Sequence, residues 1–576
     1  MANRHHTYRL LQCLTGACRP LRVEELAEIL ALDFDETKEG IPELKADWRW
    51  KDQQEAVLST CSSLVSVVDD GPYRVVQFSH FSVKEFLTSN RLATSTTDIS
   101  RFHILPEPAH TVIVKACLGI LLQSANGVGE AKVKSSSPLA KYAAEHWVDH
   151  AKFEKVSKSV EDGMRHLFDL EKPHFAGWLR LYDIDTRWVD FVDPNKNIAR
   201  GSPLYYASLC GFRDLAAHLA GEHPQQVKAR VGQNGSPLAA ALRNQHFHTA
   251  ELLYQRGANV GIRGNFNCTL LHAAAADGFV DTGQWLLAHG GDANSREVDG
   301  ETPLHWAARM GRTEFVRMLL SHIVIIDAKN KNNRTSLHLA SSGGHVEIVR
   351  LLLQHGADVA TRDLNHETAL HLVSSMRFPE IARLLIEHGA DLGAPDKNGK
   401  TPLHRALFEV SIKTARLLLQ HGADMKEQST HFSFDEAYDE RTAETVQVLL
   451  EHGADVTARD HSHSTPFPFH LAFSMTNPKI ARLLIEHSVG VTTRDGTHST
   501  LLHLASSEGT PIIVRLLIEH GADVTALDGN HKTPLHLASS GVSVKTARLL
   551  LPHSTDVSKR TTTTPTTTCH TMKSLI

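Results

Sequence analysis

The stretch "IARLLIEHGADLGAPDKNGKTPLHRALFEV", residues 381–410, recurs in related form from Ile480 and from Val514. It contains its own start and stop signals. Thr401 is a helix-capping residue, and Pro402 stands at the first helical position, where the missing N–H costs nothing. Gly389 suits the left-handed residue that closes a helix. The stretch therefore predicts a helix, a short turn, a second helix and a protruding turn.

The same unit returns at a fixed interval along most of the chain. The histidine of a T-P-L-H-like motif stands at 272, 305, 338, 371, 404, 470, 503 and 536, so the steps are 33 residues or twice that. Ser202-Pro203 and Ser236-Pro237 fit two earlier steps. About eleven units are predicted. Because one helical hairpin cannot bury its apolar face alone, stacked copies must share a continuous core, which is a solenoid.

These units resemble the ankyrin repeat in their 33-residue period, their T-P-L-H-x-A signature and their G-A-D-V ending. The resemblance covers about the last 360 residues. It implies a mainly α fold and a protein-binding surface made by the turn tips and the first helices of consecutive repeats.

The repeat also accounts for many of the histidines. Of 38 histidines, eight lie in the T-P-L-H position, and nine stand at the position that precedes the terminal glycine of the second helix in regular units. We predict structural roles for these: hydrogen bonds to the cap and to the neighbouring turn, and a favourable charge at the helix end. His461-Ser462-His463 is the best metal candidate on spacing, but it has no third ligand nearby, so no metal or other cofactor is predicted.

Three places depart from the pattern. "HFSFDEAYDE", at 431–440, lacks both the proline and the histidine, so the unit at about 425–456 is predicted to be weak. "STPFPFHLAF" loses its threonine cap. In "SHIVIIDAK", Ile323–Ile326 replaces G-A-D-V, and two interpretations stay open: a repacked connector or a partner-binding patch.

Residues 1–98 do not follow the repeat. Three amphipathic helices, within 6–17, 22–32 and 52–64, precede two β-rich runs about the turn Asp69–Pro72, and a further helix is expected at 82–89. Three helices and a hairpin predict a winged-helix-like domain. Its acidic stretch at 24–39 argues against a DNA-facing surface. Residues 99–197 predict a helical connector that covers the first repeat of a solenoid at 198–557.

A second resemblance joins these parts. "RPLRVEELAEILALDFD", "LSTCSSLVSVVDDG", "VVQFSHFSVKEFLTS" and "HILPEPAH" resemble the segment between the NACHT-type nucleotide-switch domain and the ankyrin repeats of fungal signalling ATPases of the STAND class. The resemblance implies a role in NLR-like signalling. The sequence departs from that family because it has no G-x-x-x-x-G-K-[ST] phosphate loop. The alternatives are a binding module and the C-terminal fragment of such an ATPase.

Composition narrows the class of protein. The 576 residues carry 60 basic and 65 acidic side chains, and this balance gives no broad attraction for nucleic acid or anionic membranes. The seven cysteines are widely spaced and the N-terminus is polar, so we expect a soluble cytoplasmic protein with no membrane-spanning segment. Neither a G-x-S-x-G elbow nor an H-E-x-x-H helix occurs, and we predict no catalytic residues and no enzymatic activity.

The C-terminal end lacks a polar capping repeat. Residues 558–576 are rich in threonine and are predicted to be disordered. The last repeat would then leave apolar side chains uncovered, so self-association through it is possible.

Candidate partner-binding residues are those that the repeat leaves free in its regular copies between 297 and 410. They are the two tip residues of each turn, the residue before the threonine, and the end of the first helix. A protein partner is expected, but the sequence does not predict its identity. The positions are Val298, Asp299, Glu301, Arg309, Met310, Lys331, Asn332, Arg334, Leu364, Asn365, Glu367, Met376, Lys397, Asn398, Lys400, Phe408 and Glu409.

Overall fold

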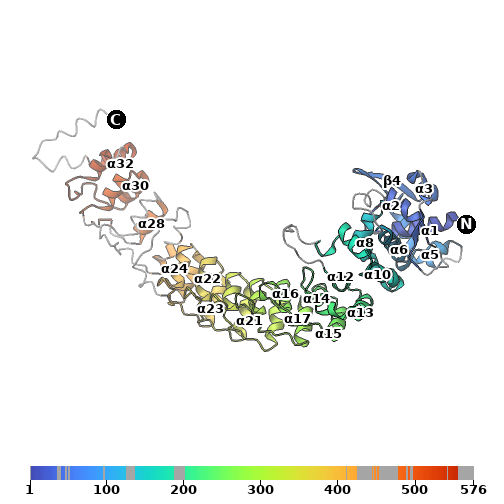
Figure 1. Ribbon diagram of the computed structural model, residues 1–576. Coiled ribbons are helices and arrows are strands. Elements are labelled where there is room, and N and C mark those ends of the chain that lie inside the picture. The colour runs from blue at the N-terminus through green and yellow to red at the C-terminus, as the bar shows by residue number, and fades with distance from the viewer. Residues whose placement is uncertain are drawn as a thin grey trace, which may run out of the picture. The chain divides into compact units, whose positions relative to one another are not determined.

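The computed structural model describes residues 2–124, 137–186, 201–423, 444–452 and 478–554, apart from short gaps inside these ranges. By its internal contacts the chain divides into two compact units, residues 1–298 and 299–576. Helices dominate both units, and the few strands lie near the N-terminus (Figure 1).

The N-terminal part of the first unit is a winged helix. Three helices precede a hairpin, as predicted, and the elements follow in the order α1 (Ala2–Gly16), β1 (Leu21–Arg22), α2 (Val23–Leu30), α3 (Gln53–Cys61), β4 (Val65–Asp70) and β5 (Tyr73–Phe78). The antiparallel sheet has the order β1-β5-β4, with Leu21 opposite Val76 and Val65 opposite Phe78. The sequence did not predict β1, because a two-residue strand leaves no alternating pattern.

Shorter elements surround this core. β2 (Leu32–Asp33) pairs with β3 (Glu43–Leu44) in a second, two-stranded sheet. After the hairpin come α4 (Phe81–Thr88), α5 (Asn90–Ala93) and the 3-10 helix η2 (Asp98–Phe102).

The connector is helical, as predicted, but in more pieces than the sequence suggested. Its elements are α6 (Pro106–Ser124), α8 (Ala140–Ala151), α9 (Val156–Ser159), α10 (Glu161–Leu167), α11 (His174–Leu181) and η3 (Ile184–Thr186). Glu28 on α2 accepts hydrogen bonds of 2.8 Å from the Ser137 hydroxyl and the Leu139 backbone N–H. This buried carboxylate joins the winged helix to the start of α8.

Aromatic packing joins the connector to the first helical hairpin of the repeats. The ring of Trp147 on α8 lies 5.6 Å from that of Phe212, and Trp178 on α11 lies 5.9 Å from Tyr206. The Tyr206 hydroxyl donates a 2.7 Å hydrogen bond to Asp183. The first repeat thus has its upstream apolar face covered, as the sequence predicted.

The first unit ends in three helical hairpins. Their elements are α12 (Pro203–Cys210), α13 (Arg213–Glu222), η4 (Pro224–Lys228), α14 (Pro237–Arg243), α15 (Phe247–Gln255), η5 (Asn265–Asn267), α16 (Leu270–Asp277) and α17 (Val280–Ala288). Ser202 and Ser236 cap α12 and α14 through their hydroxyls, at the positions that the repeat register assigned to them.

The second unit continues with the same hairpin. Its described elements are α18 (Pro303–Arg309), α19 (Thr313–Leu320), α20 (Ser336–Ser342), α21 (Val346–Gln354), α22 (Ala369–Met376), α23 (Pro379–Glu387), α24 (Pro402–Phe408), α25 (Ile412–Gln420), α28 (Pro478–Glu486), α29 (Leu501–Ser507), α30 (Pro511–Glu519), α31 (Pro534–Ser540) and α32 (Val544–Ser554). From α18 to α25 and again from α28 to α32, successive first helices pack on one another, and so do successive second helices (Figure 1). Buried Leu, Ile, Val and Ala side chains form the shared core.

Several predictions lie outside the described residues. They concern most of the weak unit at 425–456, the candidate pair His461 and His463, and the tail at 558–576. The full number of eleven repeats therefore stays a prediction, as does self-association through the last repeat.

Candidate functional site

The candidate surface is built on the protruding turns of the second unit. In each turn one polar side chain organises the backbone: Asp363 Oδ1 accepts the N–H groups of Asn365 and Glu367, at 2.8 and 3.0 Å. Asn330 and Asp396 make the same pair of hydrogen bonds in the turns before and after. Each turn tip is therefore a fixed hairpin.

Neighbouring tips are also joined to one another. The backbone N–H of Lys331 donates to the carbonyl of Asp299 at 2.8 Å, Leu364 donates to Asn332 at 3.0 Å, and Lys397 donates to Asn365 at 2.8 Å. These bonds hold consecutive tips in register, so the side chains at the tips are presented in a rigid row. The predicted tip residues in this unit are all exposed, namely Asp299, Lys331, Asn332, Leu364, Asn365, Lys397 and Asn398.

Large apolar side chains are exposed along this part of the unit. Met310 and Met376, at the same position two repeats apart, are each 49% exposed, and Phe408 is 53% exposed. Leu364 at a tip is exposed too. Lys400 Nζ lies 5.2 Å from the centre of the Phe408 ring, which shows that the base of a turn and the end of the first helix meet on one face. Val298, also exposed, ends the first unit.

The positions before the threonine require a correction. The repeat pattern predicts that Glu301, Arg334, Glu367 and Lys400 are free for a partner, yet Glu301 is only 4% and Glu367 only 6% exposed. Glu301 forms an ion pair with Arg309 and accepts a 3.1 Å hydrogen bond from Asn330 Nδ2. These two glutamates belong to the interior, while Lys400 remains exposed.

Ion pairs run from turn to turn beneath the tips. Arg334 Nε lies 3.0 Å from Asp363 Oδ2 of the next turn. Arg405, on α24, pairs with Glu367 in the turn of the preceding repeat and lies 2.9 Å from Asp396 in the turn of its own repeat. Asp363, Glu367 and Asp396 therefore each face a guanidinium, which compensates their loss of hydration. The sequence contained a signal for one pair of this network, because Arg334 and Glu367 occupy the position before the threonine in successive repeats and carry opposite charges.

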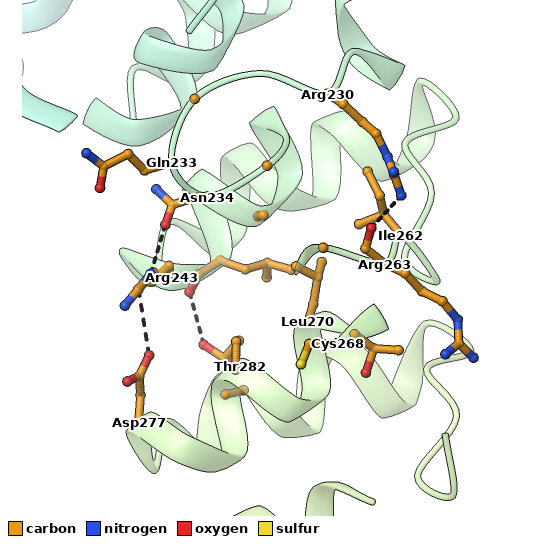
Figure 2. A pocket seen from close by; sticks show the side chains of 18 of the residues that line it. Arg230, Gln233, Asn234, Arg243, Ile262, Arg263, Cys268, Leu270, Asp277 and Thr282 are labelled. Carbon is orange, nitrogen blue, oxygen red and sulfur yellow. Dashed lines mark hydrogen bonds and ion pairs between the residues drawn. The ribbon is translucent and has the colours of Figure 1, made fainter. Parts of the chain in front are cut away.

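A cavity of about 530 Å³ lies in the first unit, between the hairpins α14–α15 and α16–α17. Arg243 reaches Asn234 Oδ1 at 3.2 Å and Asp277 at 3.7 Å, and Thr282 donates to the Leu242 carbonyl at 3.1 Å (Figure 2). Arg263 donates to the carbonyls of Asn267 and Arg296. Because these cations already bind groups of the chain itself, the cavity has no strong requirement for an anionic ligand.

The repeat histidines have the structural roles that the sequence predicted. In α18, α20, α22, α24, α29 and α31 the histidine Nδ1 lies 2.7–2.9 Å from the capping threonine hydroxyl. In the second position, His355 Nδ1–H donates to the Leu351 carbonyl at 2.8 Å, and His388 and His421 do the same in later repeats. These side chains stabilise helix ends.

Comparison with known families agrees with this geometry. A family model described as "Ankyrin repeats (3 copies)" matches residues 270–363, 360–429 and 469–561. These repeats are ankyrin repeats. A second model, described as "GPI inositol-deacylase, winged helix domain", matches residues 1–98. The chain thus combines a winged helix of this type with an ankyrin array.

Two curated proteins illustrate the similarity. The chain is 30% identical over 270 residues to azaphilone pigments biosynthesis cluster protein L of Monascus ruber, a match that covers 44% of this chain and 55% of that protein. It is 34% identical over 76 residues to alpha-latrocrustotoxin-Lt1a of Latrodectus tredecimguttatus, which covers 13% of this chain and 5% of the toxin. The matches thus span about half of the first relative and a small part of the second.

The ankyrin helices are short, and none of the described helices of the chain is long and apolar enough to cross a membrane.

Proposed function

We propose that the chain is a non-catalytic protein-binding module, and that the second unit carries the contact surface for one protein partner. The observation that supports it most directly is the exposure of Met310, Met376, Phe408 and Leu364 on a rigid row of ankyrin tips and helix ends. Soluble proteins seldom leave several large apolar side chains exposed on one surface unless it binds something.

The surroundings of these side chains fit an interface. Charged residues at the tips and helix ends, namely Lys331, Lys397, Lys400, Arg309 and Glu409, would form a polar rim around apolar contacts. Because hydrogen bonds already hold the tips in place, the tips would lose little conformational entropy when a partner binds. Glu301 and Glu367 are not part of this surface, because both are buried.

The test begins with a partner captured by the ankyrin array and purified. The double substitution Met310→Ala with Phe408→Ala should then weaken binding by about 2 kcal/mol or more, since apolar anchors dominate most interfaces. Its melting temperature should not change, because both side chains are half exposed. Ile512→Ala with Val544→Ala, two exposed apolar residues elsewhere, is the matched control. Equal affinity of the test variant and the wild type would place the site elsewhere.

A second candidate function is a place in NLR-like signalling, as part of a longer nucleotide-switch ATPase. It is favoured by the winged helix at 1–98, a type that is associated with NACHT domains, and by the packing of the connector onto the first repeat. In this proposal the winged helix contacts a separate nucleotide domain while the ankyrin array senses the partner. We also propose that the protein is cytoplasmic, because its widely spaced cysteines form no pattern typical of a disulfide-bonded secreted protein.

Nucleotide binding tests what both candidates share, namely that this chain carries no nucleotide site of its own. The chain should neither retain ATP through gel filtration nor hydrolyse it, since its sequence lacks a phosphate loop. Stoichiometric retained nucleotide would show a nucleotide site within this chain and would contradict both candidates.

A further inference from the structure

A cluster of metal-ligating side chains lies in the first unit, on segments that precede the ankyrin repeats. Cys18 follows α1 in the turn that leads to β1, while His146 and Asp149 lie one turn apart on α8. α6 packs against both α1 and α8 and so brings the two segments together (Figure 1). The Tyr142 hydroxyl accepts a 3.2 Å hydrogen bond from the backbone N–H of Cys18, which fixes the turn against α8.

The three side chains have the spacing of a metal site. Cys18, His146 and Asp149 each offer one ligand atom, and these atoms all lie within 4.8 Å of one another. His146 Nδ1 is 3.6 Å from Asp149 Oδ2. Zinc bonds of about 2.0–2.3 Å in a tetrahedron put neighbouring ligand atoms about 3.3–3.8 Å apart. Because Cys18 and Asp149 are exposed, small side-chain rotations close the remaining gap.

His146 supplies an independent observation. Its Nδ1 is shielded from solvent and has no hydrogen-bond partner. A shielded ring nitrogen without a partner costs free energy and requires a reason, and an ion is one of the few groups that would satisfy it.

The groups behind the cluster are also polar and well ordered. His150 is fully buried on the same face of α8, with Nε2 3.6 Å from Cys18 Sγ and 2.9 Å from the Tyr142 hydroxyl. Its Nδ1 lies 2.8 Å from His110 Nδ1 on α6. Such an outer layer of hydrogen bonds orients the groups nearest a metal ion in many sites.

We propose that Cys18, His146 and Asp149 bind a divalent transition-metal ion, zinc in the first place, with the fourth position open to water or to His150. Thiolate, imidazole and carboxylate together form a set that zinc accepts, and three protein ligands leave one position open. The ion would tie the turn after α1 to α8 and thus the winged helix to the connector. Cys18 and His146 lie far apart in the sequence, so no local sequence motif predicts the site.

The test uses the full chain with Co²⁺ alone as a spectroscopic probe, followed by displacement with Zn²⁺. We expect one equivalent of Co²⁺ to give a thiolate-to-metal charge-transfer band, and Cys18→Ser to abolish it. The band is the decisive readout, because histidines elsewhere on the chain can bind metal weakly without producing it. His146→Gln and Asp149→Asn should each weaken Co²⁺ binding at least tenfold.

Matched controls keep the outcome clear. Cys61→Ser and Glu154→Gln change a thiol and an exposed carboxylate outside the ligand set, and both should leave the band and the affinity unchanged. Zn²⁺ should raise the melting temperature of the wild type but not that of Cys18→Ser. The proposal is overturned if the wild type shows no thiolate band, or if Cys18→Ser retains it.

Discussion

His338 and Glu367 lie 29 residues apart and are joined by a 3.2 Å hydrogen bond from the imidazole Nε2 to the backbone carbonyl. At the other side of the ring, Nδ1 accepts the Thr335 N–H at 3.2 Å and lies 2.9 Å from its hydroxyl. An imidazole that accepts at Nδ1 must carry its proton on Nε2, so Nε2 is the donor to Glu367. One neutral histidine thus joins a helix cap to the next turn of the array.

This arrangement predicts acid sensitivity of the ankyrin array. Burial lowers the pKa of His338 from 6.5 to about 4, against smaller opposing effects from Glu367 and Asp363, and Arg334 adds to the lowering. Burial also lowers the pKa of His371. Between pH 6.5 and about 4 the His338 side chain binds more protons in the unfolded chain than in the folded one. Its contribution to the free energy of unfolding is therefore fully present above pH 6.5 and is lost as the pH falls towards 4.

The measurement is urea unfolding at pH 7, 6, 5 and 4. One pKa unit corresponds to about 1.4 kcal/mol, so His338 alone would account for a loss of up to about 3 kcal/mol at pH 4. The control is His338→Gln, which cannot titrate and should show a shallower dependence from a lower starting stability. The same slope in both proteins would contradict the assignment.

The ion pairs under the tips predict a cost for removing a buried carboxylate. Glu367→Gln should lower the free energy of unfolding by about 2–4 kcal/mol, because Arg405 and Arg334 lose part of their compensation. The control is Glu387→Gln on an exposed position of α23, which should change stability by less than about 0.5 kcal/mol. Chemical unfolding of both variants tests this, and equal effects would show that the network contributes nothing specific.

The sequence predicted the hairpins well because each helix carries its own signals. Thr401, Pro402 and Gly389 act locally, so their effect can be read without knowing what packs against them. The histidine contacts were also predictable, because the register brings each cap next to the following turn. β1 was not, because Leu21 and Arg22 become a strand only through pairing with β5.

The site was predicted less completely for a related reason. Met310 and Phe408 are exposed, as their free positions in the repeat suggested. Glu301 and Glu367 also looked free, yet both are buried, Glu301 beside Arg309 at the end of the first helix of its own repeat and Glu367 beside Arg405 on the first helix of the next repeat. The burial of Glu367 depends on a residue of another repeat, so a single unit cannot reveal it.

The irregular connector at Ile323–Ile326 predicts an increase in stability on repair. In regular repeats an aspartate here accepts the backbone N–H two residues on, as Asp358 does from Ala360 at 2.9 Å and Asp391 from Gly393 at 3.0 Å. Ile325 cannot accept such a bond and is 58% exposed. Ile325→Asp should therefore stabilise the array by about 0.5–1 kcal/mol.

Ile323, which is 93% exposed, provides the matched control. Ile323→Asp removes a similar apolar surface but stands where regular repeats have glycine, so it should not add the turn hydrogen bond. If the connector is only a repacked turn, Ile325→Asp alone raises the midpoint of unfolding and neither variant alters partner binding. If the isoleucines form a partner-binding patch, both variants weaken binding of the captured partner at unchanged fold, because an aspartate would be desolvated in the interface. Equal midpoints for the two variants and the wild type would contradict the predicted turn hydrogen bond.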